Sequence, residues 1–157
     1  EGKPPVLKSQ TVIGDGFSQR ADLANFLFGP TGLALGPDGT LYVTDGLDNE
    51  ITAIPDASTR TTSAGNGRLV TEDGLLAWPL AMVMTAQGHL IVNNGKNGQA
   101  VEIDPLSGKQ IYAHWLNTDQ AQSPPGNGNL FGIALTPDGK ALYYVEDDTN
   151  ALRIAQP

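Results

Sequence analysis

Carboxylate and amide side chains gather in three short stretches, each directly after a run of β-branched and aromatic residues. Oxygens of this kind are the ligands that hard cations such as Ca²⁺ prefer. The alternative is that they are ordinary turn residues, because Asp and Asn accept left-handed backbone geometry and bond their own backbone. The candidate ligand-binding residues are Asp45 and Asp48, then Asn93, Asn94 and Asn97, then Glu146, Asp147 and Asp148.

Asp147 and Asp148 are the predicted metal ligands. Two adjacent carboxylates repel each other unless water or a cation solvates them. The sequence lacks the spacing and the closing Glu of an EF-hand loop. Because hard cations prefer carboxylate oxygens, the metal ion that we expect at this pair is calcium.

Three aromatic residues, Phe28, Trp78 and Phe131, precede or begin apolar runs that follow long polar segments. On one hypothesis they surround a binding site and stack on a ligand. On the other they are large apolar wedges that pack between sheets.

The polar stretches belong to a repeat. The turn glycines Gly39, Gly88 and Gly139 recur at intervals of 49 and 51 residues. Around each glycine, an apolar run, a tight turn and a β-rich run indicate a hairpin, and further strands follow. Repeats of this period predict the four-stranded blades of an all-β β-propeller. A parallel β-helix has shorter rungs and does not need antiparallel hairpins.

The blades are predicted at residues 28–66, 76–117 and 130–156 of a single domain, 1–157. The last blade lacks an outer strand of its own, and residues 5–16 supply a spare one. Propellers close with four to eight blades, so three leave a wide gap. The other half belongs either to a longer polypeptide or to a second copy. We predict half of a six-bladed ring that a second copy completes.

The motifs resemble those of a known family. Gly-Asp-Gly at 14–16, Pro-Asp-Gly at 37–39, Tyr-Val-Thr-Asp at 42–45 and the Asn at 49 resemble an NHL repeat. Residues 136–145 are similar to this family and also to the gluconolactonase-like propellers. The resemblance implies a six-bladed propeller, a fold that hosts many activities.

The same resemblance argues against two known activities. Gluconolactonase-like enzymes place a metal-binding Asn just before the Gly of the inner strand, where this sequence has Thr31, Leu80 and Phe131. Amidating lyases of the NHL type hold zinc with several histidines, and this chain has only His89 and His114.

Composition excludes further classes. The net charge of −8 makes nucleic acid an unsuitable partner, and no apolar run is long enough to span a membrane. The chain has no cysteine. The polar, proline-containing start at residues 1–5 predicts a secreted or periplasmic protein.

We therefore predict a non-catalytic binding or scaffold propeller whose loop face binds a protein, a peptide or a glycan, with no catalytic residues assigned. The alternative is a metal-dependent hydrolase or lactonase with Asn93, Asn94, Glu146 and Asp147 around a divalent ion. A purely structural role is the third hypothesis.

Overall fold

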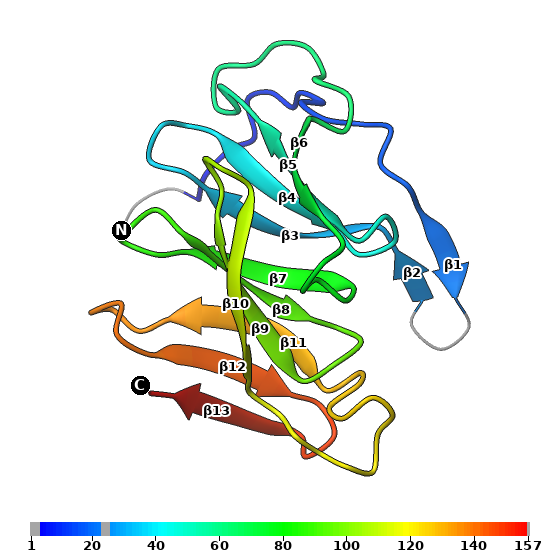
Figure 1. Cartoon of the computed structure of the whole chain (residues 1–157). Coiled ribbons are helices and arrows are strands. Elements are labelled where there is room, and N and C mark those ends of the chain that lie inside the picture. Colours follow the sequence, from blue (N-terminus) through cyan, green and yellow to red (C-terminus); the bar gives the residue numbers. More distant parts are fainter. Residues whose placement is uncertain (1–3, 23–25, 157) are drawn as a thin grey trace.

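The computed structural model describes residues 4–22 and 26–156, and every regular element in these ranges is a strand. No helix of the described residues is long and apolar enough to cross a membrane. The strands form antiparallel sheets that follow one another along the chain (Figure 1). A short hairpin of β1 (Arg20–Asp22) and β2 (Phe26–Phe28) precedes them.

Each large sheet contains consecutive strands in chain order. The first sheet comprises β3 (Pro30–Leu35), β4 (Leu41–Asp45), β5 (Glu50–Ile54) and β6 (Arg68–Glu72). The second comprises β7 (Pro79–Met84), β8 (Leu90–Asn94), β9 (Gln99–Asp104) and β10 (Lys109–Trp115). The third comprises β11 (Leu130–Leu135), β12 (Leu142–Glu146) and β13 (Ala151–Ala155).

The predicted hairpins are confirmed. The turn glycines Gly39, Gly88 and Gly139 have φ angles of 84°, 85° and 69°, a region that L side chains rarely adopt. The register keeps equivalent residues opposite one another, since Pro30 pairs with Asp45 and Pro79 with Asn94. The last residue of β4, β8 and β12 therefore has the same place in each sheet.

The main core lies between the first and second sheets. Apolar side chains from the two facing surfaces bury one another, and Leu76 from the connecting loop joins them. The fully buried members include Ile51, Leu90 and Val101. Burial of this kind stabilises by about 25 cal/mol per Å² of apolar surface, so the two sheets hold each other in place.

The inner strands lie side by side, with β7 between β3 and β11. Hydrogen bonds join adjacent sheets at this inner edge. Thr44 Oγ1 donates to the Leu80 carbonyl at 2.6 Å, and Asn93 Nδ2 donates to the Phe131 carbonyl at 2.6 Å. Val145 has the equivalent place in the third sheet and carries no polar group.

Two predicted strands differ in the structure. The first blade, predicted at residues 28–66, extends further: residues 55–67 are an irregular loop, and β6 at Arg68–Glu72 is the outer strand of the first sheet. The loop contains Asp56, Gly65 and Gly67 at positive φ, which a regular strand does not accommodate. Residues 4–19, which include the whole spare strand 5–16, form no strand within this one chain.

Candidate functional site

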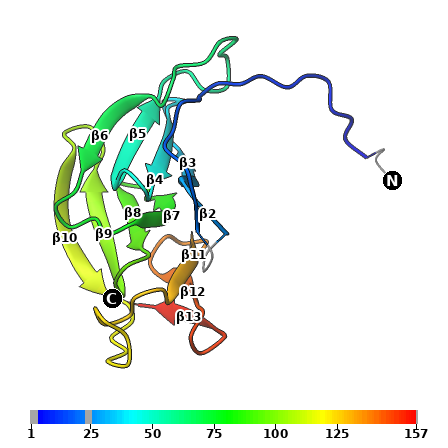
Figure 2. The ribbon, with the colours of Figure 1, turned by 90° about the vertical axis from the view of Figure 1, so that its right-hand side faces the viewer.

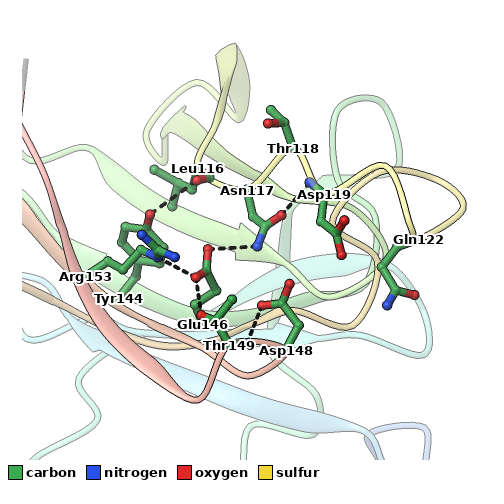
Figure 3. A pocket seen from close by; sticks show the side chains of 10 residues that line it. All are labelled: Leu116, Asn117, Thr118, Asp119, Gln122, Tyr144, Glu146, Asp148, Thr149 and Arg153. Atoms are coloured by element: carbon green, nitrogen blue, oxygen red, sulfur yellow. Dashed lines mark hydrogen bonds and ion pairs between the residues drawn. The ribbon is translucent and has the colours of Figure 1, made fainter.

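A polar pocket opens where the loop after β10 meets the third sheet (Figure 3). Its volume is about 740 Å³. In Figure 3, Arg153 and Tyr144 lie at one end, Asp119 and Gln122 lie at the other, and Glu146 lies between them. The lining residues are Leu116, Asn117, Thr118, Asp119, Gln122, Tyr144, Glu146, Asp148, Thr149 and Arg153.

Glu146 is the buried centre of this pocket. It ends β12 and is only 4% exposed. Its Oε1 accepts a hydrogen bond from Asn117 Nδ2 at 2.8 Å, and its Oε2 accepts hydrogen bonds from Thr149 Oγ1 and Arg153 Nε. Burial alone would raise the pKa of Glu146, but these hydrogen bonds and the Arg153 charge outweigh it and hold the pKa below its usual value of 4.5. Glu146 is therefore ionised at neutral pH.

The loop that carries Asn117 is held against the second sheet by backbone contacts. Asn117 N and Leu116 N both donate to the Gly98 carbonyl, at 3.0 and 2.7 Å. A Cβ atom on Gly98 would lie 1.7 Å from the Asn117 carbonyl oxygen, so only glycine permits this approach. The close packing fixes Asn117 opposite Glu146.

Two further groups face the open space of the pocket. Arg153 is half exposed, and Glu146 accepts a hydrogen bond from its Nε. A guanidinium has further N–H groups on its Nη atoms, which remain able to bind a ligand. Asp119 uses its Oδ1 to accept the Ala121 amide at 2.9 Å. The site thus presents a cation and carboxylates within one pocket.

The equivalent residues of the other sheets have different surroundings. Asn94 is fully buried; its Oδ1 accepts the Ala77 amide at 3.0 Å, and its Nδ2 donates to the Leu75 carbonyl at 3.0 Å. Asp45 is 1% exposed, and its Oδ1 accepts the Leu47 amide at 2.9 Å, while its Oδ2 has no hydrogen-bond partner among the residues that the structure describes. Burial raises the pKa of Asp45.

The other predicted polar residues do not gather around one point. Asp48 is exposed in the β4–β5 turn, and Asn97 Oδ1 accepts the Gln99 amide and Asn94 Nδ2. Asn93 points toward the third sheet, whereas Asn94 bonds the loop after the first sheet. Neighbouring residues of a strand face opposite sides of the sheet, so Asn93 and Asn94 cannot share one site.

The predicted metal pair lies at the surface, in the turn between β12 and β13. Asp147 and Asp148 are both exposed, and Asp148 already accepts hydrogen bonds from Thr149 N and Asn129 Nδ2, each at 2.9 Å. The described residues contain no cluster of three or more His, Asp or Glu side chains that could hold a metal. Glu146 is already bonded to a guanidinium, which occupies the place of a cation.

The aromatic residues do not occupy equivalent positions. Trp78 precedes β7, with φ of 56°, and its ring lies 3.8 Å from Lys96 Nζ. Phe131 is the second residue of β11, where Thr31 and Leu80 stand in the other sheets. Phe28 ends β2, and its side chain lies outside the described part of the structure.

Sequence reasoning missed Asn117, Asp119 and Arg153, which do face the pocket. Asn117 and Asp119 come from an irregular loop, and Arg153 is an isolated cation on β13, so no motif marks them. It also missed that Nδ1 of His89, the residue before β8, lies 2.6 Å from Oε1 of Glu102 on β9. Cross-strand register could have found this pair.

No family model matches the sequence, and no curated protein matches it. Solved structures do match. A gluconolactonase from Xanthomonas campestris is 22% identical with a TM-score of 0.56, over 82% of this chain and 38% of its own. A calcium-binding protein, regucalcin, from Agrobacterium tumefaciens is 22% identical with a TM-score of 0.57, over 73% of this chain and 37% of its own. Streptogramin B lyase is 19% identical with a TM-score of 0.56, over 82% and 40%.

These likenesses support the β-propeller fold, and they are consistent with a gluconolactonase-like propeller, whereas NHL repeats in particular are not identified. The chain spans about two fifths of the length of these solved proteins. The prediction of a non-catalytic scaffold is corrected: the matching structures include gluconolactonases and regucalcin, which favour the hydrolase alternative.

Proposed function

We propose that this chain contributes part of a gluconolactonase-like hydrolase that opens a lactone or a related cyclic ester. The observation that carries the proposal is the pocket of about 740 Å³ between the loop after β10 and the third sheet. This pocket combines Asp119 and Asp148 with the guanidinium of Arg153. The fold likeness to a gluconolactonase supports this choice among the activities that propellers host.

The chemistry of ester opening fits these side chains. Water attacks the carbonyl carbon and loses a proton, the ring C–O bond breaks, and the ring oxygen takes up a proton. A carboxylate such as Asp119 can take the proton of water as general base. Arg153 can stabilise the negative charge that develops on the carbonyl oxygen, and it matches the carboxylate of the product. No step is assigned to a metal ion.

Glu146 and Asn117 have positioning roles in this proposal. Both oxygens of Glu146 already accept hydrogen bonds, so this carboxylate is not free to take a proton from water. It orients the Arg153 side chain instead. A guanidinium held in one geometry binds an oxyanion with less loss of side-chain entropy.

The test is turnover of a panel of sugar lactones, followed by acid release. We expect Asp119→Asn and Arg153→Met each to lower kcat/KM by about 100-fold. Matched controls are Asp56→Asn in the loop after β5 and Arg68→Met on β6, both exposed and distant from the pocket. A correctly folded protein that opens none of the lactones, or variants that lose no activity relative to the controls, would contradict the proposal.

A further inference from the structure

We propose that two copies of this chain close one ring by exchanging their N-terminal segments. In this assembly, residues 10–14 of each copy form the fourth strand beside β13 of the other copy. The proposal rests on four separate features of the isolated chain: a free strand edge, a spare segment, a cap residue without a partner, and two uncovered apolar faces. It does not depend on the proposed activity.

The free edge belongs to the third sheet. In the first and second sheets a fourth strand lies beside the third, whereas among the described residues the third sheet ends at β13. A groove of about 390 Å³ opens between β10 and the end of β13, lined by Tyr112, His114 and Ala155 among others. A fourth strand beside β13 would border this groove, because in the preceding pair of sheets β6 contacts β10: Gln110 Nε2 on β10 donates to Thr71 Oγ1 at 2.9 Å.

The spare segment resembles β6 in sequence and in placement. Residues 10–16 read Gln-Thr-Val-Ile-Gly-Asp-Gly, and residues 68–74 read Arg-Leu-Val-Thr-Glu-Asp-Gly. The final glycines have φ angles of 76° and 63°. The β6 backbone runs against the β9–β10 turn, where a Cβ on Gly108 would lie 2.3 Å from the Val70 carbonyl oxygen.

The N-terminal segment also runs against a loop of the sheet that follows it, the β5–β6 loop. Asp15 N donates to the Gly65 carbonyl at 3.0 Å, and Ala64 N donates to the Ile13 carbonyl at 3.0 Å. It thus occupies the place that the outer strand of a preceding sheet would occupy. Figure 2 shows the chain before this point leading away from all three sheets, so the segment does not reach β13 of its own chain.

The residue that lacks a partner is Asn150, which precedes the third strand of its sheet. In the first sheet, Asn49 precedes β5 with φ of 56°; its Nδ2 donates to Asp73 Oδ1 at 2.9 Å, and Asp73 N donates to the Asn49 carbonyl at 3.0 Å. Asn150 precedes β13 with φ of 49°, but within the described residues its side chain has no hydrogen-bond partner. The residue that corresponds to Asp73 is Asp15. The Asp15 amide already donates to the Gly65 carbonyl of its own chain, so we expect only the side-chain bond, from Asn150 Nδ2 to the Asp15 carboxylate of the second copy.

The two end faces supply the remaining contact. On the third sheet Leu152 is 84% exposed and Ile154 is 47% exposed, and on the first sheet Leu33 is 61% exposed. Beside Leu33, an apolar cavity of about 360 Å³ is lined by Ile13, Phe17 and others. Uncovered apolar surface of this extent marks an interface. Each copy has a spare N-terminal segment and a free edge at β13, so two copies can complete each other. This favours a second copy over an unrelated partner.

The first experiment measures mass and strand register. We expect a particle with twice the 16.5 kDa of one chain. The pairing of Ala53 with Arg68 predicts that Ile154 lies opposite Gln10 of the second copy. The chain has no cysteine, so Gln10→Cys with Ile154→Cys should yield a disulfide-linked dimer on a non-reducing gel, whereas Gln10→Cys with Leu106→Cys should not. A 16.5 kDa particle, or a disulfide within one chain, would overturn the proposal.

The second experiment separates interface effects from misfolding. Asn150→Asp places two carboxylates opposite each other and should weaken dimer formation about tenfold or more. Adding Asp15→Asn to the same chain should restore it, because the amide and the carboxylate have changed places. Leu152→Glu should yield monomers, and the equally exposed Leu106→Glu should leave the dimer intact. No rescue by Asp15→Asn, or equal effects of the two Glu variants, would count against strand exchange.

Discussion

The two junctions between adjacent sheets are built on the same plan but end in different chemistry. At the first junction Asn94, a neutral amide, bonds the loop that leads into its sheet through both of its polar atoms. At the second junction Glu146 has the equivalent place, and its charge requires Asn117, Thr149 and Arg153. The amide closes its junction, whereas the carboxylate brings a guanidinium to the edge of an open pocket.

The difference shows how one position of a repeat can have two different chemical environments. Both junctions keep the buried strand end hydrogen-bonded, as a buried polar group must be. Only the ionised residue adds a second charge that faces solvent. The same strand geometry therefore accepts an amide at one junction and a carboxylate at the other, and the carboxylate is accompanied by Arg153.

Asn94→Asp tests the comparison most severely. The substitution places a carboxylate opposite the Leu75 carbonyl oxygen, with no guanidinium bonded to it as at the second junction. We expect the free energy of unfolding to fall by about 3 kcal/mol at neutral pH. The pKa of the new carboxyl would be raised, so the loss should diminish as the pH falls. Urea unfolding at several pH values measures this, and a stable, pH-independent variant would refute it.

Glu146→Ala removes the charge from the second junction. Arg153 loses its anion and Asn117 loses its acceptor. A fully buried pair broken in this way costs several kcal/mol, but Arg153 is half exposed, so we expect about 2 kcal/mol. Chemical denaturation gives the value, with Glu72→Ala on β6 as an exposed control. Equal stability of the two variants would show that Glu146 does not hold the junction.

Thr44→Val makes the inner edge of the first sheet resemble that of the third, where Val145 stands. The variant loses the hydrogen bond to the Leu80 carbonyl and the acceptor for Gly32 N, which lies 2.7 Å from Oγ1. We expect a loss of about 1 kcal/mol, because the shape of the side chain is kept. Thermal unfolding measures the loss, with Thr62→Val at an exposed loop residue as the control. No difference between the two would contradict the assigned role.

The smallest expected effect is a dependence on pH. The pKa of Glu146 in the folded protein lies below its ordinary value of 4.5. Its contribution to stability is therefore complete above pH 4.5 and is lost as the pH falls through the lower folded value. At neutral pH the free energy of unfolding of Glu146→Gln should be lower than that of the wild type. This difference should shrink in acid, and the change between the two pH values should be less than about 1 kcal/mol. A constant difference across this range would rule out the linkage.

Much of the fold could be predicted, because local rules produce it. The turn glycines and the β-rich runs specify the hairpins, and the period near 50 residues specifies repeated antiparallel sheets. The position of β6 could not be read in this way, since residues 55–67 and 68–72 both contain β-forming residues. The pairing with β5 and the turns at Asp56 and Gly67 decide which of the two segments forms the strand.

The candidate site, too, could be predicted only in part from the sequence. The sequence by itself determined that polar residues end the second strand of every repeat, and it pointed to Glu146. Only the tertiary structure decided that Asn117 and Arg153 meet this carboxylate while Asp147 does not. Hydrogen bonding and burial depend on which loops pack together, and the Asn117 loop reaches Glu146 only because Gly98 lets two backbones approach closely. Local preferences fix strands and turns, whereas the environment of a charge is set by residues distant in the chain.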